Sequence, residues 1–335
     1  MPLTLDIFND DAFGVTELTA AINNPPEGQI LPPPTPVVFD EEGISTLTAF
    51  IERDGDSLTL IPATERGAPP DVTTGGKRDA IPFEALHLAT HATILADEVQ
   101  NVRAFGSESE LETVQALVAK RLARMRNRLD TTILFHRFGA ITGKIYDANG
   151  TTVLLDLFDR FGIAQQTSGF ALGTADTNVA KKIRDAKRLA EDALGGYAFI
   201  TGWDGICGRG FYDALVSHAK VEEAYNRWNE GAFLRSANES GFEFGEVSWK
   251  PYYGKVGPTL FIDPDVAYLV PRGVPDHFIT RFSPADYWET VNTPGLPYYA
   301  KQRLLEFDRG IQLEVQSNPL NLCTRPRAVI KLTKA

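Results

Sequence analysis

The stretch SESELETVQALVAKRLARMRNRLDTTI, residues 107–133, decides the fold, because it predicts one long amphipathic helix. Ser107 at the N-cap and Glu110 three positions later form a capping box. At about 100° per residue, the large apolar side chains fall within one arc about 100° wide. That arc needs a partner surface over about six turns, and it consists of Leu111, Val114, Val118, Leu122, Met125, Leu129 and Ile133.

A second arc of the same predicted helix is basic, with Lys120, Arg121, Arg124 and Arg128. Such a stripe can contact DNA or an acidic partner, but a solvated face with salt bridges is the commoner structure. We interpret the stripe as a lateral or interior salt-bridging face and not as a DNA-reading one.

Strand-forming segments precede the helix. Residues 44–51 (ISTLTAFI) and 58–61 (LTLI) are rich in β-formers, with the turn signal Asp54-Gly55 between them. Residues 62–82 hold almost nothing to bury, which in a compact domain indicates a functional or disordered loop. Strand-like sequence resumes at residues 80–88. We therefore predict a long hairpin that projects from the body and lies on another molecule.

The first 40 residues are interrupted by prolines at 25–26 (PP) and 32–36 (PPPTP), which disfavour a regular element. A short helix is predicted near residues 11–23. The rest of this region is either a disordered tail or an extended arm that becomes ordered on a neighbouring subunit. The residues alone leave both interpretations open.

The sequence after the long helix predicts a hairpin and then a mixed α/β region. Residues 143–155 form the hairpin around an Asn149-Gly150 turn. From about residue 175, helices are predicted at 178–194, ended by Gly195, and at 211–228. A buried strand is expected at 197–201, and further strands are expected at 242–250, 259–262, 267–270, 311–316 and 328–332.

Composition limits the functional classes. The chain has 335 residues, a net charge of −11 and two cysteines, and it is 43% hydrophobic. An acidic surface disfavours proteins that grip nucleic acid through its phosphates. Cys207 and Cys323 lack the spacing of a zinc site and are expected to be buried and inert. The sequence has no run of about 18 apolar residues and no signal-peptide pattern, so we expect a cytoplasmic origin.

Catalytic motifs are absent. The sequence has no G-x-S-x-G, P-loop, H-E-x-x-H or C-x-x-C motif, and GICGRG at 205–210 lacks dinucleotide-binding spacing and is read as a loop. His87 and His91 would have metal-ligand spacing only on a helix, whereas this stretch resembles a strand. Asp156 and Asp159 are interpreted as surface residues, and Asp147 with Asn149 as turn residues. We predict no enzyme, no cofactor and no metal site.

Several stretches, in this order, resemble one family. They are IERDGDSLTLIP (51–62), RGAPP (66–70), TILADEVQ (93–100), VRAFG (102–106), GKIYD (143–147) and QSNPL (316–320). The chain resembles the major capsid proteins of tailed bacteriophages and, more narrowly, the phage major capsid protein E family, to which the lambda head protein belongs. The resemblance spans nearly the whole chain and is closest over residues 44–160.

The resemblance implies an α+β fold of the Hong Kong 97 type. Residues 1–43 would be an N-terminal arm, and 44–100 a β-hairpin with an extended loop that lies on a neighbour. Residues 101–170 would be a peripheral domain with a spine helix, 171–304 an axial domain, and 305–335 strands that return to both. Arg66, Lys77 and Arg78 then become candidates for inter-subunit contact.

The resemblance also implies the partners. Subunits would assemble as hexamers and pentamers into an icosahedral head around double-stranded DNA, without sequence-specific binding or membrane association. Because the arm starts almost at Met1, a separate scaffolding protein is expected. A portal protein would occupy one vertex, and a decoration protein is an open option. The protein would be assembled in the bacterial cytoplasm and reside in the virion.

Three alternatives stay open from the sequence. A bacterial compartment shell of the same fold would enclose a cargo enzyme instead of DNA. A tail-tube subunit would be mainly β and would lack the long helix. An α/β enzyme would need a pocket with perturbed titratable groups, which the sequence does not signal.

Overall fold

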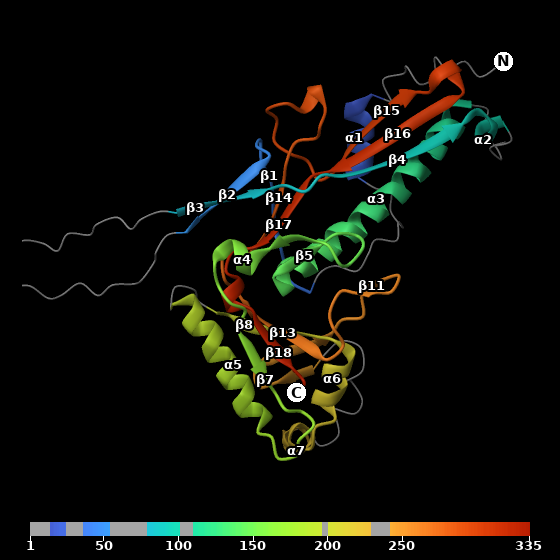
Figure 1. The fold of residues 1–335 in the computed structure, drawn as a ribbon. Helices are drawn as coiled ribbons and strands as arrows, with labels where there is room; N and C mark the ends of the chain where they lie inside the picture. The colour runs from blue at the N-terminus through green and yellow to red at the C-terminus, as the bar shows by residue number, and fades with distance from the viewer. Residues whose placement is uncertain (1–13, 25–35, 54–78, 101–109, 196–199, 229–241) are drawn as a thin grey trace, which may run out of the picture.

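The structure of the chain is a computed structural model that describes residues 14–24, 36–53, 79–100, 110–195, 200–228 and 242–335. Figure 1 shows an elongated molecule. A three-stranded sheet on a long helix forms one end, an α/β unit forms the other, and a two-stranded hairpin projects to one side. None of the helices in the described part of the chain has the length and apolarity to cross a membrane.

Helix α3 (Glu110–Thr142) is the long helix that the sequence predicts. Its apolar positions from Val118 to Ile133 are buried, as predicted. The side chains of Leu111 and Val114 and the predicted cap Ser107 lie outside the described residues. The helix continues nine residues beyond Ile133, because Leu134, Phe138 and Ile141 are buried in a second core.

The first core lies between α3 and a three-stranded antiparallel sheet. The sheet has the order β15 (Tyr299–Leu304), β16 (Gly310–Ser317), β4 (Leu88–Leu95). Side chains alternate along β16, so Ile311, Leu313 and Val315 face α3 while Gln312 and Glu314 face away. The strand predicted at 311–316 is therefore confirmed. The short helix α2 (Ala96–Gln100) follows β4.

Helix α1 (Val15–Asn23) confirms the predicted N-terminal helix and packs on β15 and α3. Arg126 of α3 donates to the carbonyl oxygens of Ile22 and Asn23, the latter at 3.0 Å. Its guanidinium lies 4.8 Å from the ring centroid of Tyr298, whose hydroxyl donates to Asp130. Arg126 and Asp130 also pair one helical turn apart. This half-buried network fastens the N-terminal helix to α3.

The second core surrounds the C-terminal part of α3. It includes the sheet β1-β14-β17 and the hairpin β5–β6, which confirms the hairpin predicted around Asn149-Gly150. Asp156, read from the sequence as a surface residue, is the N-cap of α4 and accepts from the amides of Phe158 and Asp159. The elements are β1 (Asp40–Gly43), β14 (Phe278–Phe282), β17 (Pro319–Cys323), β5 (Lys144–Tyr146), β6 (Val153–Asp156) and α4 (Leu157–Phe161).

The α/β unit contains a six-stranded sheet of order β7-β18-β13-β8-β10-β9 and three helices. Helix α5 is confirmed with both its predicted ends, since the Asn178 side chain caps it and Gly195 adopts φ 62°. The elements are β7 (Thr167–Gly169), α5 (Val179–Leu194), β8 (Gly202–Cys207), α6 (Arg209–Val216), α7 (Ala219–Trp228), β9 (Phe242–Phe244), β10 (Val247–Pro251), β13 (Val266–Arg272) and β18 (Ile330–Thr333).

Three sequence predictions in this unit are wrong. The helix predicted at 211–228 is two helices, α6 and α7, which are separated at Ser217 and His218. Whereas residues 197–199 of the strand predicted at 197–201 lie outside the described residues, the loop predicted at 205–210 is instead the end of β8 and the start of α6. Gly205 is needed there because a Cβ would lie 2.3 Å from the Trp249 ring. The strand predicted at 242–250 is a hairpin, because Gly245 and Glu246 adopt positive φ.

Two strands of the predicted unit 171–304 pair elsewhere. β14 lies between β1 and β17, and β15 pairs with β16. Strand β7 joins the six-stranded sheet from outside that range, and so does β18, which belongs to the segment 305–335 that was expected to return to both domains. The sheets join strands that lie far apart in the sequence. Local sequence patterns do not encode which of these strands pair. The remaining elements are β11 (Lys255–Val256), β12 (Thr259–Leu260), η3 (Trp288–Thr290), η4 (Glu306–Asp308) and η5 (Pro326–Ala328).

The projecting hairpin consists of β2 (Thr48–Arg53) and β3 (Asp79–Glu84), which run antiparallel from Thr48↔Glu84 to Arg53↔Asp79. The predicted long hairpin is thus present at its base (Figure 1). The predicted turn at Asp54-Gly55 and the predicted strand 58–61 lie outside the described residues.

We predict that Arg126→Met lowers the free energy of unfolding by about 2 kcal/mol, because it removes the cation that pairs with Asp130 and the donor to two carbonyl oxygens. Chemical denaturation of the unassembled subunit measures this change. Arg124→Met, at an exposed position on the same helix, is the matched control and should change it by less than about 0.5 kcal/mol. Equal effects of the two substitutions would show that the network does not hold α1.

Acid should destabilise the subunit through two buried histidines. Burial lowers the pKa of His136 and of His277 from 6.5 to about 4. Between about pH 6.5 and pH 4 only the unfolded state takes up these protons, so stability falls as the pH falls. The loss approaches about 3 kcal/mol per histidine at pH 4. Thermal unfolding measured from pH 7 to pH 4 should show a smaller fall in melting temperature for His136→Gln than for the unaltered chain. An equal fall in both would contradict the assignment of the acid sensitivity to the buried histidines.

Candidate functional site

Among the candidate groups in the described residues, the two cysteines are buried and His87 and Asn149 are hydrogen-bonded within the fold, whereas His91 is exposed. Cys207 and Cys323 are fully buried, as predicted, and burial raises the pKa of both thiols. His91 lies on β4, and His87 is engaged with Asn318. In the described part of the chain, no three His, Cys, Asp or Glu side chains cluster as metal ligands would. The amides of residues 151 and 152 donate to Asn149 at 2.9 Å, which is turn chemistry, as predicted.

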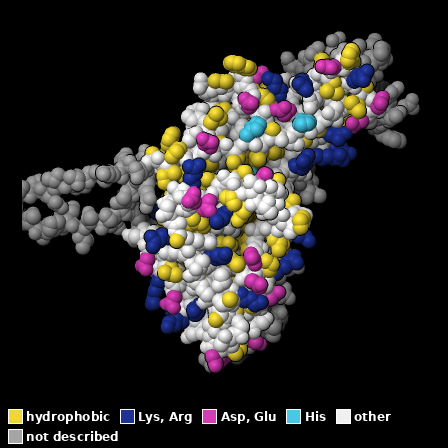
Figure 2. All heavy atoms as spheres, in the orientation of Figure 1, with side chains coloured by type: hydrophobic (Ala, Val, Ile, Leu, Met, Phe, Trp, Pro, Cys, Tyr) yellow, Lys and Arg dark blue, Asp and Glu magenta, His cyan; other side chains and the backbone are white. Residues whose placement is uncertain are grey.

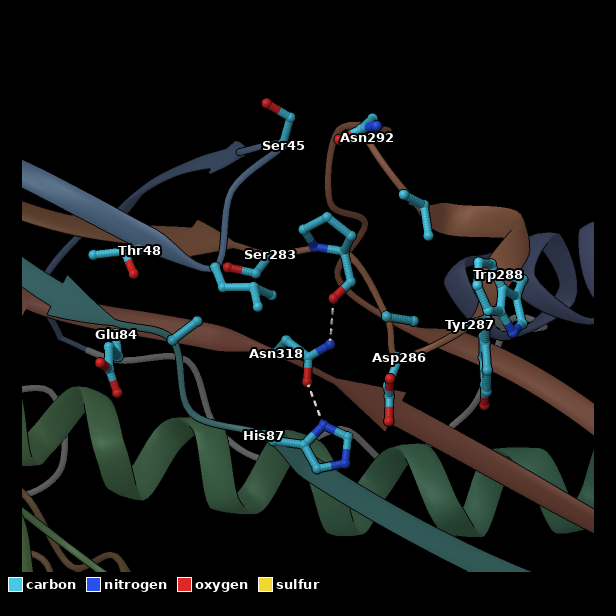
Figure 3. Close-up of a pocket in the computed structure, with 15 residues that line it drawn as sticks. Ser45, Thr48, Glu84, His87, Ser283, Asp286, Tyr287, Trp288, Asn292 and Asn318 are labelled. Carbon is cyan, nitrogen blue, oxygen red and sulfur yellow. Dashed lines mark hydrogen bonds between the residues drawn. The ribbon is translucent and has the colours of Figure 1, made fainter.

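The chain instead presents exposed apolar surfaces, and the first surrounds a groove. This groove of about 970 Å³ lies between the base of the β2–β3 hairpin and the loop from β14 to β15. Trp288 on η3 is 93% exposed, and Leu47 and Val291 are exposed beside it. Glu84 and Asp286 add carboxylates to its lining. Figure 3 shows the residues of both segments that line this hollow.

Close backbone contact fixes one wall of the groove. Ile44 donates its amide to the Phe282 carbonyl at 2.8 Å, and Gly295 donates to the Ile44 carbonyl at 3.0 Å. A Cβ on Gly43 would lie 2.1 Å from the Gly295 oxygen, so only glycine permits this approach. The base of the projecting hairpin is therefore joined to the loop that carries Trp288.

Asn318 fixes the floor of the groove. Its side-chain nitrogen donates to the Pro284 carbonyl at 2.7 Å, and its oxygen lies 2.8 Å from Nδ1 of His87 (Figure 3). Since that oxygen can only accept, His87 donates from Nδ1. Through Asn318 these hydrogen bonds connect the residue before β4 to the loop after β14, on two sides of the groove.

A second exposed apolar surface lies at the tip of the β15–β16 hairpin. Phe307 is 86% exposed and has φ 60°, a conformation unusual for a bulky residue. Leu304 and Leu95 are exposed at the same end of the sheet, where Leu95 pairs with Gly310. The Arg309 guanidinium lies 5.5 Å from the Phe307 ring centroid. An exposed and strained aromatic tip points to a contact outside the subunit.

The predicted contact residues Arg66, Lys77 and Arg78 all lie outside the described residues. The sequence missed Trp288 and Phe307, because neither belongs to a periodic pattern and their exposure depends on distant partners. The one local signal is an aromatic residue in a short segment between strands.

The four cations of the basic stripe on α3 differ in whether they pair with a carboxylate. Arg121 pairs with Glu98, as a salt-bridging face requires. Lys120, Arg124 and Arg128 are exposed, and no carboxylate within the described ranges forms an ion pair with them. Figure 2 shows dark blue side chains gathered where α3 reaches the surface. The salt-bridge interpretation therefore holds for one of the four residues.

Comparisons with known proteins identify the family to which the chain is similar. Residues 14–334 match the family described as phage major capsid protein E. The major capsid protein of Salmonella phage Felix O1 is 26% identical over 329 residues, covering 88% of this chain and 89% of that protein. The major capsid protein of Pseudomonas phage KPP10 is 27% identical over 314 residues, with the same coverage.

The fold agrees as well. A crystal structure of an E. coli CFT073 prophage protein, described as a capsid protein, superposes with a TM-score of 0.58 and 16% identity. The alignment covers 96% of this chain and 99% of that one. The fold is the predicted α+β capsid fold of the Hong Kong 97 type. Proteins of this kind are structural components of the phage head shell and not enzymes. The chain therefore belongs to the phage major capsid protein E family.

Proposed function

We propose that this capsid subunit assembles into hexamers and pentamers that close into the icosahedral head of a tailed phage. The observation that carries this proposal is the exposed apolar surface at two places, around Trp288 and around Phe307. A soluble monomer rarely exposes such clusters, and they mark sites of protein–protein contact. The two places lie at different ends of the sheet β15-β16-β4, so one subunit can contact several neighbours.

The β2–β3 hairpin and the tip of the β15–β16 hairpin have shapes that suit contact between subunits. One face of the β2–β3 hairpin packs on the second core through Phe83, and on the hairpin the Phe50 side chain is 64% exposed. We assign residues 44–100 to this hairpin and its extended loop, residues 1–43 to an arm, and the six-stranded sheet with its helices to the axial unit. Arg66, Lys77 and Arg78 stay candidates for contact with a neighbouring subunit. Segments of this kind bury little surface alone and gain it on assembly.

The chemistry of the chain suits a wall around DNA. A net charge of −11 disfavours tight binding of packaged DNA to the shell. We therefore propose that the head encloses double-stranded DNA without sequence-specific binding. A separate scaffolding protein during assembly, a portal protein at one vertex, and assembly in the host cytoplasm belong to the same proposal. A decoration protein is a further candidate partner.

A cargo-enclosing compartment shell is the remaining alternative. The two curated relatives favour the phage head, since both are major capsid proteins of phages. The contents of the purified particle separate the two functions, because a head contains DNA whereas a compartment contains a protein cargo.

Assembly itself is testable by expressing the full chain with and without the scaffolding protein of its phage and imaging it by negative-stain electron microscopy. We expect capsomers, tubes or closed shells. A compact monomer or dimer under every condition would overturn the proposed function.

Trp288 and Phe307 should be needed for assembly but not for folding. We predict that Trp288→Ser raises the protein concentration required for shell formation by about tenfold, because a buried aromatic anchor is lost from an interface. The unfolding free energy of the unassembled subunit should change by less than about 0.5 kcal/mol, since Trp288 is exposed there. Light scattering measures assembly, and the same outcome is expected for Phe307→Ser.

Trp288→Phe is the matched control, because it keeps an aromatic side chain and should assemble almost as the unaltered chain does. Unchanged assembly of Trp288→Ser would show that the groove is not an interface.

A further inference from the structure

Helix α3 is far more basic than the chain to which it belongs. From residue 116 to residue 142 it carries six Lys and Arg side chains and one carboxylate, although the net charge of the chain is −11. Three of the six cations form ion pairs within the fold, namely Arg121 with Glu98, Arg126 with Asp130, and Arg137 with Glu41. Folding therefore accounts for half of the excess charge on this helix.

The other three cations, Lys120, Arg124 and Arg128, form one exposed row. They follow one another at four-residue intervals, so their Cα atoms lie about 6 Å apart on one face of α3. No carboxylate in the described residues pairs with any of them. Arg128 donates to the Thr90 hydroxyl at 3.5 Å, which leaves its charge unbalanced. Because like charges at this spacing repel one another along a helix, the row fits an anionic partner outside the subunit.

The row and the groove around Trp288 lie on opposite sides of the sheet β15-β16-β4. Helix α3 covers one face of this sheet, and the row lies about 140° round the helix from the centre of its buried arc. The loop that carries Trp288 lies on the other face. Its Tyr287 hydroxyl donates to Glu314 at 3.3 Å, and Glu314 faces away from α3. The apolar groove and the cation row therefore front different surroundings.

The composition of the cationic face favours nucleic acid over protein as the partner. A protein interface has an apolar core, and none of the exposed large apolar side chains in the described residues lies on α3. DNA phosphates, in contrast, are bound mainly by Arg, Lys and polar donors. The row is about 12 Å long, and a duplex carries about one phosphate per 1.7 Å of its axis. Each of the three cations can therefore reach a phosphate.

We propose that Lys120, Arg124 and Arg128 line the inner surface of the shell and contact the phosphates of packaged double-stranded DNA. This inference rests on the proposed function and names the residues that face the enclosed DNA. Phosphates are the same in every sequence, so the contact carries no sequence information. The row supplies fixed counterions on an otherwise acidic subunit, and the contact should weaken as the salt concentration rises.

Chemical modification of Lys120 tests the contact in the unaltered protein. Filled heads, and the same heads after DNA release and nuclease digestion, are treated with an amine-acetylating reagent, and mass spectrometry measures the modification of each lysine. At low salt Lys120 should react at least about threefold more slowly in filled heads, because a phosphate shields its amine. The difference should shrink in about 1 M salt, where the Debye length is about 3 Å.

Lys301 is the matched control for the opposite face of the sheet. It pairs with Glu289, and its amine lies 5.0 Å from the ring centroid of Tyr287, on the side away from α3. Its rate of acetylation should be equal in filled and emptied heads.

Substitution in the full chain tests what the row does for the DNA. Lys120→Gln, Arg124→Gln and Arg128→Gln together should leave the yield of shells unchanged, because these side chains are exposed and pack in neither core. The fraction of heads that retain DNA after heating at low salt should fall at least about threefold, because three fixed counterions per subunit are lost. Lys120→Arg with Arg124→Lys and Arg128→Lys keeps the charges and should retain DNA as the unaltered chain does.

A second triple substitution controls for net charge. Lys181→Gln, Arg184→Gln and Arg188→Gln on α5 remove the same charge from exposed positions on a helix where carboxylates lie among the cations, as the pair of Arg188 with Asp185 shows. Heads with this control should retain their DNA.

Three results would overturn the inference. Equal acetylation of Lys120 in filled and emptied heads, or normal DNA retention by the glutamine variant, would place the row away from the DNA. Protection of Lys120 only while a scaffolding protein is inside would assign the row to an acidic protein. Loss of shell yield in the glutamine variant would assign it to contact between subunits. All three leave the proposed function intact, which fails instead if the unaltered chain forms no shells or forms shells that hold a protein cargo and no DNA.

Discussion

Packing of α3 against two successive cores holds the sheet β15-β16-β4 and the rest of the subunit in one arrangement. From Val118 to Ile133 the helix buries its apolar face against the sheet β15-β16-β4. From Leu134 to Ile141 it packs on β17, β5 and the base of the hairpin. Gly139 permits the closest approach, since a Cβ there would lie 2.8 Å from the Ile145 backbone. Because one rigid helix serves both cores, neither can shift without the other.

Because the subunit is rigid, its exposed apolar surfaces are held in fixed positions. Trp288 is held by a loop that is bonded to β1 and to Asn318, and Phe307 ends two strands that are packed on α3. Both aromatic side chains are therefore presented at fixed distances along one body, although each has little to pack against in the subunit. Fixed anchors reduce the conformational entropy that is lost on association. A shell protein needs such anchors, because many weak identical contacts must form in register.

The sequence predicted those features that depend on neighbouring residues. The apolar arc of α3, the helix at 178–194 with its end at Gly195, and the Asn149-Gly150 turn all encode local geometry, and the structure has each of them. The resemblance to capsid proteins then supplied the fold, which no pattern alone would have given. The break between α6 and α7 and the pairing of β14 with β1 depend on tertiary packing, so local patterns could not predict them.

The assembly surfaces were the least predictable part. Exposure of Trp288 results from where η3 is held by residues far away in the sequence, and Phe307 looks like an ordinary turn residue. The basic stripe was interpreted as salt-bridged, yet only Arg121 has a carboxylate partner in the described ranges. Whether a charged side chain is paired depends on the elements beside it, and the sequence pattern does not contain that information.

Hydrogen–deuterium exchange on unassembled subunits and on purified shells tests the central claim most directly. If α3 couples two preformed cores and the apolar surfaces serve assembly, amides of residues 118–141 should be strongly protected in both states. Amides of residues 286–292 and 305–309 should become protected only in shells. Rapid exchange along α3 in the free subunit, or equal exchange of both surface segments in the two states, would contradict this account.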